Sequence, residues 1–122
     1  MKEIKPIQTN VENKQPANLE AEQALLGSIL VNNDIIDEVA NIINASIFYD
    51  PAHIKIFEVI QSLNGKGMIA NPITLKNYFE KDNMLNDVGG TEYLVKLTRF
   101  SGSSKQAIDY AKIIHEMYLR RE

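Results

Sequence analysis

The sequence predicts an all-α protein, a compact bundle of about six helices. Two observations support this fold class. Apolar residues recur at three- and four-residue steps through most of the chain, which is the spacing of helices that bury one face. Side chains that favour helix starts precede several of these runs. With 122 residues, of which 44% are apolar, the chain fits one domain with a real core.

The first helix is predicted over residues 19–31. Asn18 is a good N-cap because its side-chain oxygen can accept a hydrogen bond from a first-turn N–H group. Gly27 lies inside this helix, where glycine costs about 1 kcal/mol relative to alanine. We therefore expect a neighbouring helix to approach closely at Gly27, with a hinge or a partner contact as the alternative. Residues 1–17 are polar and contain two prolines, which indicates a flexible tail.

Four further helices are predicted before the polar loop at residues 101–104. Asp50 and Pro51 form a clear helix start, since proline suits the first helical position. Thr91 is expected to cap a later helix. The expected ranges are 34–44 after the polar cluster at 32–34, then 51–65, 75–82 and 91–99. Together with the first helix they form a head domain over residues 18–104.

The last helix is predicted from Lys105 to Glu122 and differs from the others. Its apolar residues are spread more widely than one buried face requires. Neither glycine nor proline ends it. We expect this helix to be the beginning of a helical hairpin and the chain to be part of a longer protein.

Charge is unevenly distributed along a chain whose net charge is −3. Residues 19–54 contain six acidic residues and no lysine or arginine, whereas six bases outnumber three acids in residues 95–122. Two ordinary solvated faces would explain this pattern. The alternative is an acidic face for a basic protein partner and a basic end near an acidic neighbour. The candidate residues of the acidic face are Glu20, Glu22, Asp34, Asp37 and Glu38.

A search for chemistry gives no catalytic, cofactor-binding or metal-ligating residue. The chain has no cysteine, which excludes disulfides and thiolate metal sites. Asp50 and His53 have a spacing that can ligate metal, but two ligands are too few for a closed site. We expect Asp50 to cap a helix and His53 to be a partly buried packing residue. No phosphate-binding glycine motif, secretory signal or membrane-spanning run is present, so the expected location is the cytoplasm.

Several motifs resemble the amino-terminal domain of the DnaB-type bacterial replicative DNA helicases. Residues 16–27 match the family's opening pattern P-x-x-x-E-A-E-Q-x-x-L-G. Further matches follow in the family's order and at about its spacing, so that the resemblance covers residues 16–122. They are Phe48-Tyr49 with His53, Ile56 and Phe57; Pro72-Ile73-Thr74-Leu75; Val88-Gly89-Gly90 with Tyr93-Leu94; and Tyr110-Ala111.

The resemblance implies a non-catalytic piece of an ATP-dependent enzyme that unwinds duplex DNA at the replication fork. In this family, the helical head and hairpin form a collar on a six-membered ring, often as a trimer of dimers. ATP and magnesium bind in a separate motor domain that is absent from this chain, and the ring acts on single-stranded DNA. The expected partners are therefore other subunits, primase and a helicase loader. Residues Tyr110, Ile113, Ile114 and Met117 are the candidate self-association face, although each of them could be core instead.

Two alternatives remain at this point. The predicted helices at 75–82 and 91–99 could form a helix-turn-helix pair that reads DNA, but the second helix offers only Lys96 and Arg99 for base contacts. The chain could also be a stand-alone adaptor domain without a motor.

Overall fold

The computed structural model describes residues 16–122, which fold into six α-helices and three short 3₁₀ turns without a β-strand in that range. The all-α prediction is confirmed. A flexible tail is predicted at residues 1–17. Residues 1–15 of this tail lie outside the described part of the chain. No helix among the described residues is long and apolar enough to cross a membrane.

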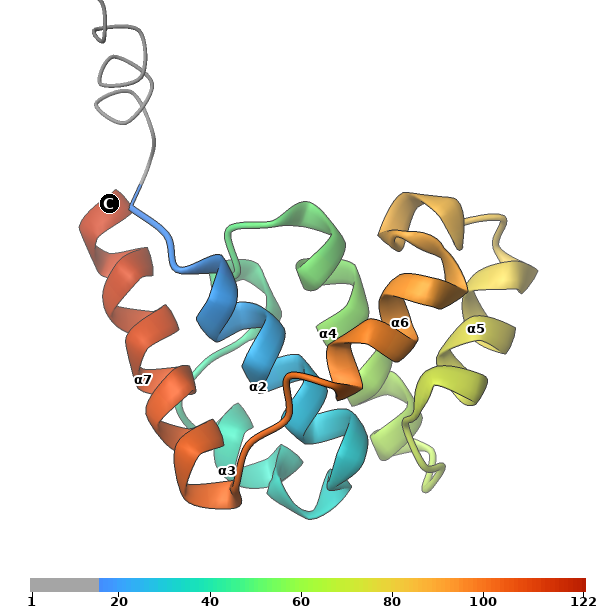
Figure 1. Ribbon diagram of the computed structural model, residues 1–122, viewed down its shortest axis with the longest axis horizontal. Helices are drawn as coiled ribbons and strands as arrows, with labels where there is room; N and C mark the ends of the chain where they lie inside the picture. Colours follow the sequence, from blue (N-terminus) through green and yellow to red (C-terminus); the bar gives the residue numbers. More distant parts are fainter. Residues whose placement is uncertain (1–15) are drawn as a thin grey trace, which may run out of the picture.

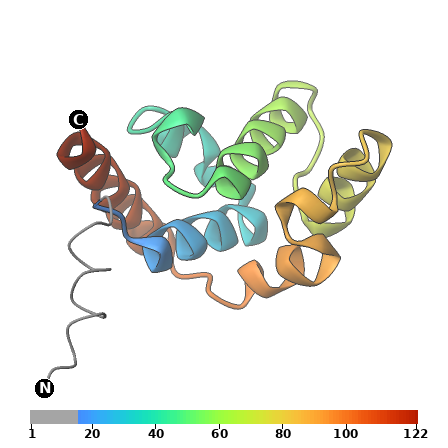
Figure 2. The same cartoon turned by 90° about the horizontal axis from the view of Figure 1, so that it is seen from above.

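Helix α2, Leu19–Val31, is the central element of the fold. Helix α7, Ser104–Arg121, packs along one side of α2, and helix α6, Gly90–Thr98, packs on another. Helix α4, Pro51–Gly65, contacts α2 from a third direction, as Figures 1 and 2 show. Because α2 is covered from three directions, every residue from Ala24 to Leu30 is buried, rather than one narrow stripe.

Gly27 is the point where α2 and α6 come into backbone contact. A Cβ atom added at Gly27 would lie 1.9 Å from the carbonyl oxygen of Leu97. The predicted close approach is therefore confirmed, since only glycine leaves room for that carbonyl group. The next residue, Ser28, accepts a hydrogen bond from the N–H of Gly102 at 2.9 Å, which holds the loop between α6 and α7 against α2.

The segment predicted as one helix over 34–44 is broken into short pieces. A 3₁₀ turn at Asn33–Ile35 leads into the five-residue helix α3 at Ile36–Ala40, and a second 3₁₀ turn follows the segment at Ala45–Ile47. Helix α3 ends at Ala40, and Asn44 starts the next turn, because its side chain accepts a hydrogen bond from the N–H of Ser46.

The starts of the remaining helices agree with the prediction to different degrees. Asp50 caps α4 by accepting the N–H of Ala52 at 2.8 Å, as expected. Helix α5, Pro72–Lys81, begins three residues before the predicted start because Asn71 and Thr74 form a capping box. The prediction for α6 was wrong in its cap.

The residue at the N-cap of α6 is Gly89, not Thr91, and no side chain caps this helix. Gly89 has a φ of +98°, and a Cβ there would lie 2.7 Å from the Cβ of Tyr93. The chain therefore turns through two glycines at this point, and α6 begins at Gly90. A 3₁₀ turn at Asn86–Val88 precedes it.

The last turn of α7 lies beside the start of the described chain (Figure 1). Arg121 joins the two, because its guanidinium donates to the carbonyl oxygens of Pro16 at 2.7 Å and Ile47 at 2.6 Å. The same guanidinium lies over the rings of Tyr49 and Tyr118. Both backbone segments are thereby fixed to the end of α7.

Candidate docking surface

A shallow groove runs between α2 and α7 and encloses about 470 Å³. Its base includes two small residues of α2, Ala21 and Ala24, which leave space above the helix. Its apolar lining is Phe100, Tyr110 and Ile113. Phe100 follows α6 and is 39% exposed, so its ring is available to another molecule. The polar lining of this α2–α7 groove is Asn18, Glu20 and Gln23.

The groove joins residues from both surfaces predicted from the sequence. Glu20 comes from the candidate acidic face, and Tyr110 and Ile113 come from the candidate self-association face. Phe100 was missed as a surface residue, because its spacing from Tyr93 and Leu97 is that of a buried helical stripe. One concave surface therefore combines an exposed aromatic ring, two half-buried apolar side chains and a carboxylate.

Ile114 does not belong to the candidate self-association face. It is 1% exposed and packs in the core together with Ala107 and Ala111, which precede it at helical spacing on α7. Tyr110, Ile113 and Met117 are half-buried and remain accessible in part. Ile114 continues the buried stripe formed by Ala107 and Ala111, at steps of four and then three residues, so it faces the core. Ile113 lies beside this stripe and is only partly buried.

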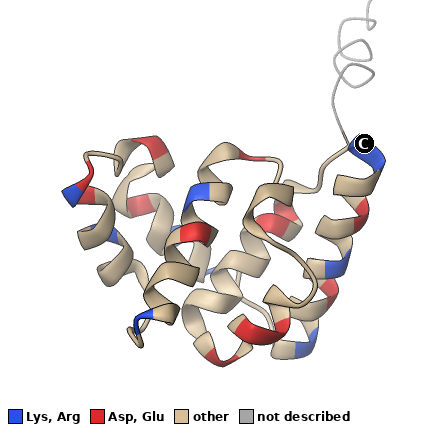
Figure 3. Ribbon diagram, turned by 180° about the vertical axis from the view of Figure 1, so that it is seen from behind, with Lys and Arg blue, Asp and Glu red and all other residues tan. Residues whose placement is uncertain are grey.

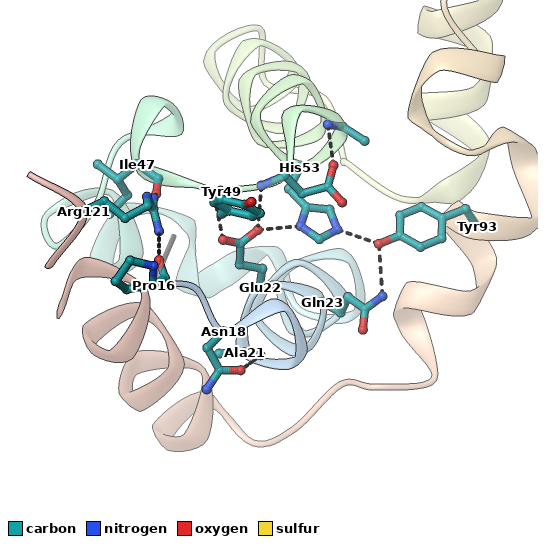
Figure 4. Close-up of polar contacts among 12 residues, drawn as sticks. Pro16, Asn18, Ala21, Glu22, Gln23, Ile47, Tyr49, His53, Tyr93 and Arg121 are labelled. Carbon is teal, nitrogen blue, oxygen red and sulfur yellow. Dashed lines mark hydrogen bonds and ion pairs between the residues drawn. The ribbon is translucent and has the colours of Figure 1, made fainter. Parts of the chain in front are cut away.

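Glu22 does not belong to the candidate acidic face, although Glu20, Asp34, Asp37 and Glu38 are all exposed. Glu22 is 1% exposed. Its carboxylate accepts the N–H of Tyr49 at 2.7 Å and that of Asp50 at 3.3 Å, just before α4 begins. Its Oε1 also lies 2.7 Å from Nδ1 of His53 (Figure 4). These bonds satisfy the buried carboxylate and leave it unavailable to a partner.

His53 extends this buried network to α6. Its Nε2 lies 2.5 Å from the hydroxyl oxygen of Tyr93, and the two rings are stacked with centroids 5.9 Å apart. Gln23 donates to the same hydroxyl at 3.2 Å. Every group is satisfied when His53 carries its proton on Nδ1, donates to Glu22 and accepts the Tyr93 O–H. The network of Glu22, His53, Tyr93 and Gln23 therefore ties α2, α4 and α6 together.

His53 was predicted to be a partly buried packing residue, and the structure corrects this. The side chain is 1% exposed and hydrogen-bonded at both ring nitrogens. Neither nitrogen is left for a metal ion, and residues 16–122 contain no group of three or more potential metal ligands. Burial of the neighbouring hydroxyl raises the pKa of Tyr93; the charges of Asp50 and Glu22 add to this rise, and the bond from Gln23 opposes it.

The basic residues of the carboxy-terminal part do not form a continuous basic face. On α7, lysine and arginine positions alternate with acidic ones, as the blue and red bands of Figure 3 show. Lys96 of α6 and Arg99, which directly follows this helix, are exposed, but Glu92 lies in the same shallow hollow. A helix that reads DNA needs clustered positive charge, which this arrangement lacks.

Comparison with known proteins places this geometry in a family. The family model for the DnaB-like helicase N-terminal domain matches residues 14–116. The chain belongs to this family. The crystal structure of the N-terminal domain of DnaB helicase from Mycobacterium tuberculosis superposes with a TM-score of 0.84 and 32% sequence identity, covering 88% of this chain and 78% of that one.

Curated relatives carry the same domain as part of much longer proteins. The replicative DNA helicase DnaB of Rickettsia felis is 39% identical over 106 residues, which is 87% of this chain and 22% of the relative. The protein of the same name from Pasteurella multocida is 33% identical over 107 residues, or 88% of this chain and 23% of that protein. The DnaB N-terminal domain described here thus spans about a fifth of these relatives. The match does not favour the helix-turn-helix alternative.

Proposed function

We propose that this chain is the non-catalytic head of a hexameric, ATP-dependent replicative DNA helicase that unwinds duplex DNA at the replication fork. In this role the head forms part of a collar, associates with other subunits and holds primase and a helicase loader near the emerging single strand. Binding of ATP and magnesium belongs to a motor domain outside this chain. The protein would act in the cytoplasm, as part of the replisome.

The α2–α7 groove is the observation that supports this proposal best. An exposed Phe100 and the half-buried Tyr110 and Ile113 line one concave surface, although a monomer gains nothing by exposing them. Aromatic and aliphatic groups that surround a small-residue floor are typical of a site that receives a side chain of another protein. The family of the chain consists of helicase N-terminal domains, and assembly and docking are the roles left to a domain without a motor.

The two sides of the groove suggest a division of roles. On α7, the residues Tyr110, Ile113 and Met117 would contact a second subunit. On the α2 side, Glu20 would contribute to docking of a basic partner, together with the exposed Asp34, Asp37 and Glu38, which lie outside the groove. Exposed carboxylates contribute mainly to the rate and specificity of association, so this docking would weaken at high salt.

The self-association role is tested by placing aspartate on α7. Sedimentation equilibrium should show a wild-type dimer and an Ile113→Asp/Met117→Asp variant whose dimer dissociates about a hundredfold more readily. Because Ile113 also touches the core, circular dichroism must confirm that helicity is retained, and Ile113→Ser/Met117→Ser provides a milder pair. Lys112→Asp is the matched control, since it introduces the same residue at an exposed position. A wild-type monomer at all concentrations would contradict this role.

The docking role needs the complete helicase and purified primase. Reversing the charges at Glu20, Asp37 and Glu38 to lysine should weaken primase binding by about tenfold or more at low salt, measured by biolayer interferometry. The same three changes should leave ATP hydrolysis unchanged, because these residues lie outside the motor. Equal binding by the variant and the wild type would refute the acidic docking face.

A further inference from the structure

Helix α5 lies on the opposite side of α2 from α7 (Figure 1), and a second group of exposed apolar side chains lies where the chain enters α5. The segment between α4 and α5 and the first turn of α5 expose three large apolar side chains. Met68 is 49% exposed, Ile69 is 62% exposed and Ile73 is 76% exposed. Single exposed apolar residues are common, but a group of this size on one short segment is typical of an interaction site.

This exposed segment is held in place by hydrogen bonds. Ala70 is fully buried between the exposed residues. Its N–H donates to Oδ1 of Asn33 at 2.7 Å, and its carbonyl oxygen accepts from Nδ2 of Asn33 at 2.9 Å. The hydroxyl of Thr74 donates to the carbonyl oxygen of Ile69 at 2.9 Å. The fold therefore presents Met68 and Ile69 from a fixed backbone, which lowers the entropy lost when a partner binds.

Beside this segment, a groove of about 590 Å³ lies between the end of α4 and α5. Met68 and Ile73 line it, and Lys66 and Lys81 contribute two positive charges against the single carboxylate of Asp82. Nζ of Lys66 lies 5.6 Å from the centre of the Tyr78 ring, which positions its charge at the groove. The α4–α5 groove is thus apolar with a net positive charge, on a protein whose net charge is −3.

We propose that the α4–α5 groove docks an acidic amphipathic helix of a partner protein. A trough between two helices suits a third helix, whose apolar face packs into it while the charged residues meet the rim. Leucine-like side chains of the partner would contact Met68 and Ile73, and its carboxylates would pair with Lys66 and Lys81. Nucleic acid fits less well, because the exposed side chains Met68 and Ile73 are aliphatic, the Tyr78 ring is already covered by Lys66, and Asp82 repels phosphate.

This proposal does not depend on the function proposed above. The α4–α5 groove shares no residue with the α2–α7 groove. Either surface can therefore fail its test while the other passes.

The probe for the test is a fluorescein-labelled helical peptide of about 16 residues, with leucine at three- and four-residue steps and glutamate on the opposite face. Fluorescence anisotropy with the 122-residue chain should give a Kd on the order of 10–100 µM at low salt. Amide chemical-shift changes in ¹H–¹⁵N spectra should be confined to residues 63–82. A peptide with lysine in place of glutamate should not bind, because the rim is positive.

Two variants and one control localise the binding. The Ile73→Asp variant and the Lys66→Glu/Lys81→Glu variant should each bind the glutamate peptide with a Kd that is about tenfold or more higher. Both alter exposed side chains, so thermal unfolding should stay close to that of the wild type. Leu119→Asp, at a residue that is 56% exposed on α7, should bind the peptide as the wild type does.

Four results would overturn the proposal. They are a lack of binding at millimolar protein, equal binding of the lysine peptide, shift changes located outside the groove, and displacement of the peptide by single-stranded DNA. Loss of self-association in the Ile73→Asp variant would assign the groove to a second copy of this chain instead.

Discussion

Nδ1 of His53 lies 2.7 Å from Oε1 of Glu22, and both side chains are almost completely buried. The pair joins the first turn of α2 to the first turn of α4, and Tyr93 extends the connection to α6. Glu22 stands in the E-A-E-Q segment, where it was predicted to face a partner. Its position in the core means that this part of the motif stabilises the head, while Glu20 of the same segment stays exposed.

Glu22→Ala should therefore destabilise the protein by about 3 kcal/mol, because two backbone N–H groups and the His53 ring lose their buried acceptor. Glu20→Ala is the matched control, two residues away and exposed, and should change stability by less than about 0.5 kcal/mol. Urea denaturation followed by circular dichroism measures both. Equal effects of the two changes would show that the buried network contributes little.

Tyr93 should make stability depend on alkaline pH. Burial raises its pKa above the unfolded value of 10.0, so its contribution is complete below pH 10 and is lost as pH rises through the folded-state pKa. The difference in unfolding free energy between wild type and Tyr93→Phe should therefore shrink as pH rises above 10. Using the difference cancels the titration of other tyrosines and lysines. A difference that stays constant above pH 10 would contradict this role of Tyr93.

Gly27→Ala should destabilise the protein by about 3 kcal/mol or more, because the new methyl group would overlap the Leu97 carbonyl group and force α6 away from α2. Gly65→Ala provides the control, since a Cβ at Gly65 meets no atom within 4 Å. Alanine at that position should be neutral or stabilising by up to about 1 kcal/mol. Thermal unfolding of the two variants measures the contrast, and a stable Gly27→Ala protein would argue against the close helix contact.

Arg121→Ala should destabilise the last turn of α7 by about 1–2 kcal/mol, since it removes two hydrogen bonds to carbonyl oxygens and the contacts with two tyrosine rings. Arg120 makes an exposed ion pair with Glu116, and Arg120→Ala should have almost no effect. Hydrogen exchange of amides in the last turn of α7 distinguishes the two. Similar exchange in both variants would refute the anchoring role of Arg121.

Local chemistry explains which parts of the fold were predictable. Asn18 and Asp50 cap helices through neighbours two or three residues away, so the sequence contains all that determines them. The contact at Gly27 was also predictable in kind, because glycine inside a helix needs a reason. Its partner, Leu97, was not, since 70 residues separate the two and only tertiary packing joins them.

The environments of charged and apolar side chains were harder to predict. Glu22 shares a helix face with Leu25, Leu26 and Ile29, and that register was the signal of its burial. Glu22 was nevertheless predicted to be exposed because it is charged, and a buried carboxylate requires hydrogen-bond donors. The donors of Glu22 come from residues 49–53, which are distant in the sequence. The α4–α5 groove was missed because the sequence around it has no repeating apolar pattern. Met68 and Ile69 lie in a connection without periodicity, so no pattern separates exposed from buried there.

The most direct test of the proposed function is to sequence the native reading frame beyond Glu122. A helicase head requires a second hairpin helix, a linker and then a strand followed by G-x-x-x-x-G-K-[ST], the phosphate-binding loop of the motor. We expect this continuation. A reading frame that ends near Glu122 or enters an unrelated domain would contradict the helicase proposal and leave a stand-alone adaptor.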